Sequence, residues 1–351
     1  MNKKARKRIL CILLQLMMLV LLGNSALAAE SPIHETDGEA KEVTENGYTF
    51  MITEAEDENH QLIRNYKIER PMSRSGVDLD EIRALLIAMG VEETTAYDLP
   101  ADKLQYIATS ESIQTTTSYV KIDEDNNRIY ADEETALREA AIINARDDER
   151  LANLTQGIMP TEDWEDGDQW MRLHYTVVHN WGYNYGFMIG SKWLTMPITR
   201  SWDTLGACAS HVTAVAGSGW GEWFYDVSIL QNGKVVSTKR EKEEVTDISI
   251  ASVEQWGGMG ITFWLPFDIQ EQYSAMYFRN FNATLWFQGN VSQYEQATFF
   301  NTRGSYDHSK FALMVKPSAS LSVDGGKASM GLAPTITKQS WFIDFTIHYV
   351  P

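Results

Sequence analysis

An alternating run of aromatic residues is the first feature of the sequence that could bind a ligand. Between residues 179 and 187, rings stand at every second position, at Trp181, Tyr183, Tyr185 and Phe187. A strand would place these rings on one face about 7 Å apart, because each residue advances about 3.3 Å. Exposed rings at this spacing could stack on successive sugars. The run predicts a polysaccharide-binding surface formed by Trp181, Tyr183 and Tyr185, with burial between two sheets as the alternative.

A twelve-residue segment that begins at Asp123 has the oxygen spacing of a calcium loop. Asp123, Asp125, Asn127 and Glu134 stand at positions one, three, five and twelve, where an EF-hand supplies ligands. The sixth position requires glycine for a sharp turn, and Arg128 occupies it. The spacing indicates a Ca²⁺ site, whereas the arginine favours a polar turn between a strand and a helix.

Two further groups carry acid, base or nucleophile chemistry. Cys208 and His211 lie close together, but two residues are too few for a zinc site and a nucleophilic cysteine needs a positioned base. A buried structural cysteine is the favoured interpretation. Residues 304–309 include Asp307 and His308 without a nucleophile elbow or a paired-histidine motif. This segment is predicted to be a polar loop between strands.

A long aromatic stretch at 278–290 raises a second class of function. Pore-forming proteins insert long amphipathic strands with Trp and Tyr at the membrane interface, and this stretch is long enough for that role. Residues 264–268, Trp-Leu-Pro-Phe-Asp, are faintly similar to the aromatic-Pro-aromatic-Asp run of sandwich-type cytolysins. The likeness covers a small part of the chain and assigns no family. An ordinary sandwich strand has the same pattern.

The amino terminus has the order of a secretory signal. Five basic residues without an acid precede an apolar run at 9–22, and small residues then lead to Ala28. The apolar run of 14 residues is shorter than the roughly 20 that span a bilayer. We expect residues 1–28 to be a cleaved signal. The mature protein is then secreted or held in the cell envelope, without a stable membrane span.

Charge and aromatic content change together near Trp164. Residues 29–169 contain 34 acidic and 12 basic residues, and residues 170–351 contain 14 and 13. All 11 Trp and 12 of the 13 Phe residues lie at or after Trp164. The acidic surface repels phosphate backbones, which argues against nucleic-acid binding. We predict a flexible acidic leader at 29–45, a small acidic α+β region at 46–163 and an aromatic-rich domain at 164–351.

Helical and strand patterns are mixed in the acidic region. Ile82, Leu85 and Met89 recur at helical spacing after capping aspartates, and Gly90 supplies a left-handed stop. The predicted elements are a hairpin within 48–69, helices at 78–89, 101–108 and 132–153, and a strand at 115–122. The longest helix is expected to bury a face formed by Leu137, Ala140, Ala141 and Asn144.

Beyond the predicted boundary, apolar and polar residues alternate as they do in half-buried strands. The alternation is clearest at 171–177 and 341–349. An Asn-Gly pair at 232–233 predicts a type I′ hairpin turn, because both positions need positive φ angles, and a Gly-Gly pair at 325–326 predicts another hairpin. Many short strands without long helices indicate an antiparallel β-sandwich or jelly roll. The predicted fold class is therefore mainly β, with a small acidic α+β region in front.

Three classes of function follow from these patterns. The first is an exported, non-catalytic protein whose aromatic sandwich binds polysaccharide or another cell-envelope component. The second is a membrane-active or pore-forming β protein that binds a membrane surface, and the third is a hydrolase with two carboxyl groups about 5–10 Å apart. No cofactor other than the Ca²⁺ considered above is predicted. The direction in which the ring row points is the deciding observation.

Overall fold

The structure is a computed structural model that describes most of the chain from residue 40 onward. All described residues belong to the unit Thr36–Pro351. The predicted signal at 1–28 lies outside the described residues, as does most of the predicted leader. The described residues are 40–45, 48–57, 60–68, 78–122, 127–155, 169–197, 200–232, 234–270, 274–291, 299–309, 316–324, 327–333, 335–336 and 338–348.

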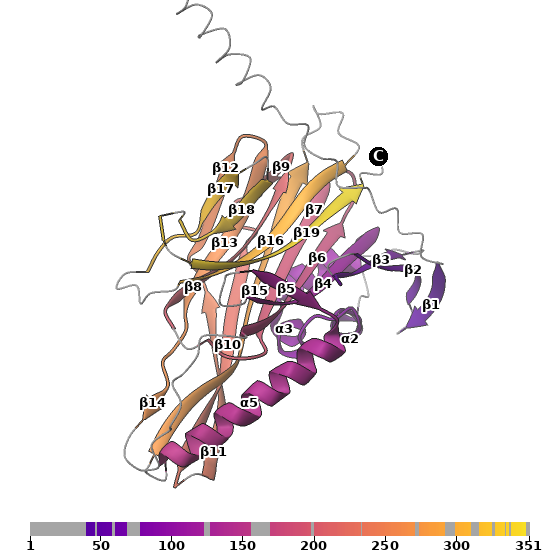
Figure 1. Ribbon diagram of the computed structural model, residues 1–351. Helices are drawn as coiled ribbons and strands as arrows, with labels where there is room; N and C mark the ends of the chain where they lie inside the picture. Colours follow the sequence, from indigo (N-terminus) through magenta and orange to yellow (C-terminus); the bar gives the residue numbers. More distant parts are fainter. Residues whose placement is uncertain are drawn as a thin grey trace, which may run out of the picture. The chain divides into compact units, whose positions relative to one another are not determined.

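Twelve strands form the larger of two antiparallel sheets (Figure 1). Its strands are β1 (Lys41–Glu45), β2 (Tyr48–Glu56), β3 (Leu62–Ile68), β4 (Ser112–Ile122), β5 (Arg128–Ala131), β6 (Gln169–His179), β7 (Asn184–Trp193), β9 (Val212–Ala214), β10 (Trp220–Gln231), β11 (Lys234–Val245), β14 (Ile269–Gln270) and β15 (Ser274–Val291). The main order is β1-β2-β3-β4-β6-β7-β15-β10-β11. Strand β5 pairs with β4, and both β9 and β14 pair with β15.

Five strands form the smaller sheet, and a hairpin covers its outer face. The strands are β8 (Trp202–Ser210), β12 (Ile248–Val253), β13 (Trp256–Trp264), β16 (Phe299–Ser309) and β19 (Lys338–His348), and the hairpin consists of β17 (Ser320–Asp324) and β18 (Lys327–Gly331). The sheet order is β12-β13-β8-β16-β19. The hairpin packs through Ala328 and Met330 against Cys208 of β8.

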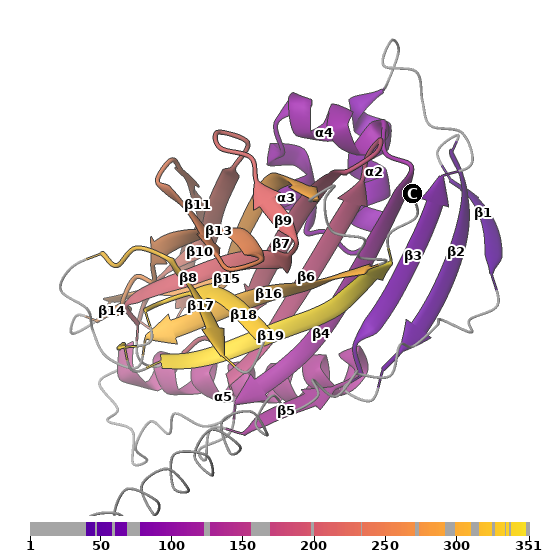
Figure 2. The same cartoon turned by 90° about the horizontal axis from the view of Figure 1, so that it is seen from above.

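The main hydrophobic core lies between the two sheets. Tyr175, Phe187 and Leu285 of the larger sheet share one buried cluster with Ile261 and Trp341 of the smaller sheet. Figure 2 shows β16 and β19 lying over the larger sheet. Two antiparallel sheets around a common core form a sandwich. The predicted mainly β fold is therefore confirmed.

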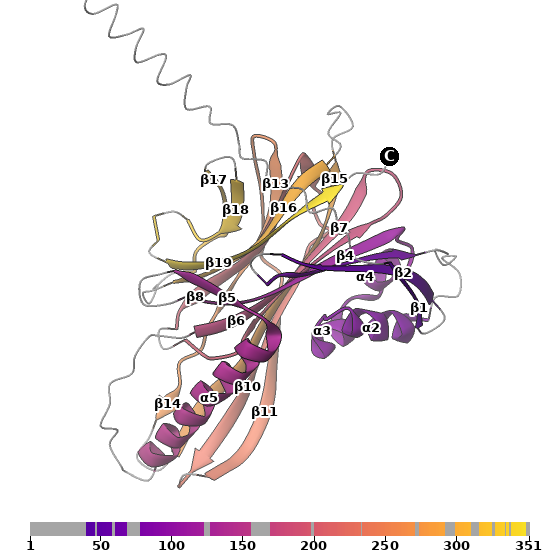
Figure 3. The same ribbon diagram turned by 45° about the vertical axis from the view of Figure 1, so that its right-hand side comes forward.

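Four helices cover the outer face of the larger sheet, the face turned away from the smaller sheet (Figure 3). They are α2 (Leu79–Ala88), α3 (Glu93–Asp98), α4 (Ala101–Ala108) and α5 (Glu133–Thr155). The first three bury apolar side chains against Val178, Met188 and Trp286 of the sheet. Among the described residues, no helix is long and apolar enough to cross a membrane.

Local chemistry explains where α2 begins and ends. The Asp78 side chain accepts a hydrogen bond from the Asp80 backbone, which satisfies one of the free N–H groups at a helix start. Gly90 follows the last turn with a φ of 98°, a conformation that favours glycine. The predicted helix at 78–89 and its glycine stop are confirmed.

The predicted buried face of α5 is wrong in part. Leu137 is 45 % exposed, whereas Ala136 and Ala140 pack against Tyr119 and Trp170 of the sheet. Two large rings fill the space beneath the helix, so small side chains fit there better than leucine. The helix is therefore rotated relative to the face that the sequence indicates.

The change in composition near residue 164 falls within one sheet. The predicted boundary itself lies among residues outside the described ranges. On either side of it, β4 and β6 pair along their full lengths, with Ser112 opposite His179 and Ile122 opposite Gln169. The last five residues of the predicted leader form β1. Strands from the acidic region therefore extend the same sheet as strands from the aromatic region.

Both hairpins predicted from glycine-containing turns are present, as is the one predicted within 48–69, which is formed by β2 and β3. Strands β10 and β11 pair with Gln231 opposite Lys234, and Asn232 between them has a φ of 48°. Strands β17 and β18 pair with Asp324 opposite Lys327. Short turn sequences therefore determine these two connections locally.

Candidate functional site

The turn between β6 and β7 exposes Trp181 to solvent. Trp181 is 59 % exposed, and Gly182 beside it has a φ of 67°. The Trp181 backbone N–H donates to Asn180 Oδ1 at 2.8 Å, and Asn184 Nδ2 donates to the Trp181 carbonyl at 2.9 Å. Both backbone polar groups of Trp181 are therefore held by neighbouring side chains. The indole ring extends from a fixed backbone.

Asn180 connects this turn to the helices on the outer face. Its side chain is buried, and Nδ2 donates to the Tyr106 carbonyl and to Thr109 Oγ1, each at 3.3 Å. Its backbone N–H donates to the Asn184 carbonyl at 2.9 Å. These bonds join the turn to the end of α4, so its position depends on more than the two strands.

For most of the ring row the alternative of burial between the two sheets is correct, and a row of exposed rings is not present. Tyr185 and Phe187 are almost fully buried in the core between the sheets, and Tyr185 stacks on His179 with ring centroids 4.7 Å apart. Tyr183 is partly buried and packs against the same core. Strand alternation starts only at β7, whereas Trp181 precedes the strand in a turn. Trp181 is therefore the one residue of the predicted row whose ring is mostly in solvent.

The predicted calcium loop lies partly outside the described residues, and its described part contains a strand. Arg128 begins β5, which pairs with the end of β4. Residues 128–131 form β5 between Asn127 and Glu134 of α5, so a strand separates the two described members of the predicted ligand set. Asp123 and Asp125 lie outside the described residues. Within the described ranges, no three His, Cys, Asp or Glu side chains are grouped to hold a metal ion.

The favoured interpretation of Cys208 is confirmed. Its side chain is completely buried, and it packs with Trp256, Ala328 and Met330 beneath the β17–β18 hairpin. Burial raises the pKa of the thiol to about 12. The nucleophilic form, the thiolate, is therefore strongly disfavoured in the folded protein.

The segment 304–309 is a buried strand, so the predicted polar loop is wrong. His308 Nδ1 lies 2.9 Å from Asp203 Oδ1, and the Tyr306 hydroxyl donates to Asp203 Oδ2 at 2.5 Å. Trp193 Nε1 in turn donates to the Tyr306 hydroxyl at 2.8 Å. These four side chains connect the two sheets inside the core. Each is nearly or completely buried, which makes the network part of the packing rather than an open site.

Asp307 points to the opposite face of the same strand. Its carboxyl group pairs with Lys338 and accepts a hydrogen bond from the Leu332 backbone at 2.7 Å. Burial raises its pKa, although the neighbouring ammonium group acts in the other direction. Asp307 therefore fixes the segment after β18 to the smaller sheet.

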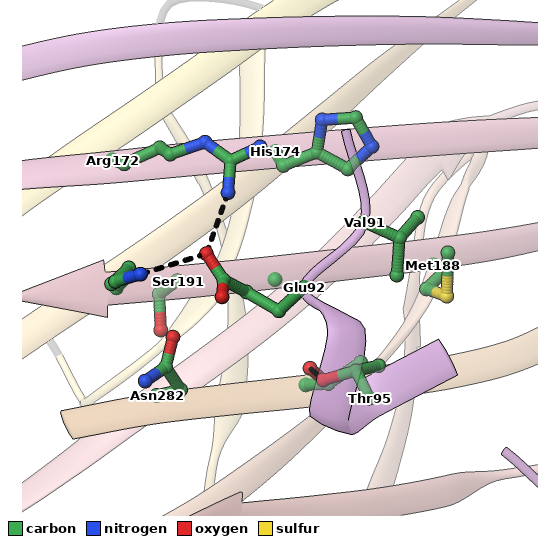
Figure 4. A pocket seen from close by; sticks show the side chains of 11 residues that line it. Val91, Glu92, Thr95, Arg172, His174, Met188, Ser191 and Asn282 are labelled. Atoms are coloured by element: carbon green, nitrogen blue, oxygen red, sulfur yellow. Dashed lines mark hydrogen bonds and ion pairs between the residues drawn. The ribbon is translucent and has the colours of Figure 1, made fainter. Parts of the chain in front are cut away.

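A small polar cavity lies where α3 meets the outer face of the larger sheet (Figure 4). Its volume of about 20 Å³ is enough for one water molecule. Polar side chains from the helical segment and from β6, β7 and β15 surround it. These include Glu92, Thr95, Arg172, His174, Lys192 and Asn282.

Glu92 connects the link between α2 and α3 to two strands. Its Oε1 accepts from Arg172 Nη1 at 2.9 Å and from Lys192 Nζ at 3.1 Å. Arg172 also donates to the Gly90 carbonyl. Figure 4 shows Glu92 directed toward Arg172 across the cavity. The ion pairs therefore hold the end of α2 and the start of α3 on the sheet.

His174 forms the base of the cavity on β6. Its Nδ1 lies 2.8 Å from Thr117 Oγ1, and its Nε2 lies 3.1 Å from Thr176 Oγ1. Burial lowers the pKa of the imidazole well below its usual value, and the nearby Arg172 charge lowers it further. The ring is therefore neutral at pH 7, and each of its nitrogens forms a hydrogen bond with a threonine hydroxyl.

Glu222 lies on the same outer face on β10 and is only 2 % exposed. Burial, together with the negative charge of Asp98 on α3, raises the pKa of its carboxyl group to about 8. A hydrogen bond from Thr95 acts in the opposite direction. The sequence shows only one more acid in an alternating strand, so its unusual proton affinity could not be predicted. It depends on α3 covering the strand.

Two of the carboxyl groups with raised pKa, those of Glu222 and Asp307, lie on opposite sides of the sandwich. Glu222 faces α3 on the outer side of the larger sheet, whereas Asp307 faces the segment after β18 on the outer side of the smaller sheet. The core of the sandwich separates them. The chain matches no protein-family model and no curated protein. Its function is therefore inferred from the geometry of its sites.

Proposed function

We propose that this protein is an exported, non-catalytic binding protein that recognises a polysaccharide through Trp181. The observation that carries the proposal is the exposed indole ring on the β6–β7 turn. Trp170, Trp286 and Trp341 are almost completely buried, so exposure is unusual for a tryptophan in this fold. A flat ring in solvent offers a stacking surface for the face of a sugar. The secretory pattern at 1–28 is consistent with a ligand outside the cell.

The rigidity of the turn supports a recognition role. Asn180 and Asn184 hold both backbone polar groups of Trp181 before any ligand arrives. Binding then orders little more than the indole side chain, which limits the loss of conformational entropy. Tryptophan also contributes strongly when it lies at the centre of an interface. The geometry therefore favours a binding site over an accidental exposure.

The alternative of a pore-forming protein has less support. The stretch at 278–290 lies in β15, which pairs with β7 on one side and mainly with β10 on the other. Residues 281–287 are buried on both faces of the sheet. Packing between the smaller sheet and the helices is sufficient to account for their apolar character.

Affinity electrophoresis of the secreted protein tests the proposal. Gels that contain peptidoglycan fragments or soluble polysaccharides should retard the intact protein, and Trp181→Ala should restore most of its mobility. Tyr97→Ala is the matched control, because Tyr97 lies on α3 and is 57 % exposed. Circular dichroism establishes that both variants remain folded. Equal mobility of the intact protein and Trp181→Ala in every gel would contradict the proposed site.

A further inference from the structure

Three polar side chains form a row across the sheet beside Trp181. Asn184 of β7 lies opposite Asn290 of β15, and Asn290 lies opposite Thr213 of β9. Directly opposite residues in antiparallel strands place their side chains on the same face. All three side chains are exposed. Because Asn184 also donates to the Trp181 carbonyl, the row begins at the turn that carries the indole ring.

The face on which this row lies follows from the neighbouring residues. Tyr185, Val212 and Val291 each adjoin one member of the row in sequence, and all three are buried in the core between the sheets. Alternation therefore directs Asn184, Asn290 and Thr213 to the outer face. The row lies on the face that carries the helices, beyond the part that α4 covers.

The row has the chemistry and the length to bind a sugar chain. Each amide has donors and an acceptor, and a threonine hydroxyl both donates and accepts, so the row matches groups of hydroxyls. Neighbouring strands are about 4.8 Å apart, so three strands present these groups over about 10 Å. This is about the length of a disaccharide. Among the described residues, the side chains of Asn290 and Thr213 have no hydrogen-bond partner in the protein, so both are available to a ligand.

Charge indicates which kind of polysaccharide is bound. None of Asn184, Asn290 and Thr213 is ionisable, and the chain carries a formal net charge of −18 at pH 7. A strongly negative protein repels polyanions, including acidic polysaccharides and anionic membranes. Hydroxyl groups of an uncharged sugar escape this repulsion. Neutral polysaccharide is therefore the class that the row fits best.

We propose that the Trp181 site binds a neutral polysaccharide whose chain crosses β7, β15 and β9 along Asn184, Asn290 and Thr213. This inference rests on the function proposed above and adds a direction and a chemical class. One sugar ring stacks on the indole, and the hydroxyls of the next unit bond to the row. The contact that is specific to this inference is the one made by Asn290, in the middle of the row.

Affinity electrophoresis with Asn290→Ala tests the inference. In gels containing a neutral glucan, mannan or xylan, the variant should bind about two- to tenfold more weakly, the loss expected for one net hydrogen bond. Asn290→Asp should bind no better than Asn290→Ala, since it exchanges amide donors for acceptors. Gln105→Ala, which removes an exposed amide on α4, is the matched control and should bind as the intact protein does.

The outcomes separate this inference from the function on which it rests. If Trp181→Ala loses binding and Asn290→Ala retains it fully, the row is not part of the site, and the binding function remains supported. Retention by polygalacturonate but by no neutral polysaccharide would overturn the chemical class. If the intact protein is retained by no polysaccharide, both proposals fail, and the same holds if it binds only phosphatidylglycerol vesicles.

Discussion

The pH dependence of stability provides a sharp test of how α3 covers the larger sheet. Burial raises the pKa of Glu222 from 4.5 to about 8. In the unfolded chain the pKa of this carboxyl group returns to its ordinary value. At pH values between these two pKa values, the Glu222 carboxyl group is protonated in the folded state and ionised in the unfolded state. The free energy of unfolding therefore falls as pH rises, by up to about 1.4 kcal/mol per pH unit.

The contribution of Glu222 is fully present below about pH 4 and is lost once the pH exceeds about 8. From about pH 5 to about pH 8 the loss reaches an upper limit of about 4 kcal/mol. This limit already includes the opposing effect of Lys242, whose ammonium group favours the ionised carboxylate. A glutamine at this position has nearly the shape of the protonated acid but does not ionise. Glu222→Gln should therefore remove this part of the pH dependence.

Urea unfolding of the intact protein and the variant over this pH range measures the effect. Subtracting their free energies of unfolding removes the contributions of the other titrating groups. The variant should become steadily more stable relative to the intact protein as pH rises. Glu243→Gln is the matched control, because Glu243 is exposed on β11 and lies opposite Trp223 rather than Glu222. Parallel curves for the intact protein and Glu222→Gln would show that the carboxyl group is not desolvated by α3.

Two further predictions follow from buried contacts. Cys208 should not react with iodoacetamide in the native protein, because its thiol is inaccessible and its pKa is raised to about 12. It should react after unfolding in urea. Rapid labelling of the native protein would contradict the buried position of the thiol. Gly90→Ala should destabilise the protein by more than about 1 kcal/mol, since φ is positive and the added Cβ would lie 3.2 Å from Arg172. Gly182→Ala also has a positive φ, of 67°, but nothing lies within 4 Å of the added Cβ. Urea unfolding should therefore show the larger loss for Gly90→Ala, and an equal loss in both variants would refute this expectation.

Features that depend on a few adjacent residues could be predicted from the sequence. Gly90 stops α2 because the backbone there needs a positive φ, and the Asn-Gly pair at 232–233 closes a hairpin for the same reason. The alternation at 171–177 correctly identifies the residues of β6 that face the main core. In each case the physical cause lies within the segment itself.

Features that depend on distant segments could not be predicted in this way. The second face of β6 carries Arg172, His174 and Thr176, which the pattern assigns to the polar side of a half-buried strand. His174 and Thr176 are buried, because α2 to α4 cover that side. Alternation shows which residues share a face but carries no information about what covers the face. The low pKa of His174 and the high pKa of Glu222 arise only from that cover.

The ring row was misinterpreted for a related reason, and the sequence contained a signal against it. Alternation continues only as far as the strand does, and Trp181 stands between Asn180 and Gly182, both typical turn residues. A ring in a turn projects beyond the last pair of strands, where a facing sheet cannot cover it, whereas Tyr185 and Phe187 inside β7 face the core. Aromatic residues flanked by turn residues are therefore better candidates for exposed binding sites than aromatic residues repeated along a strand.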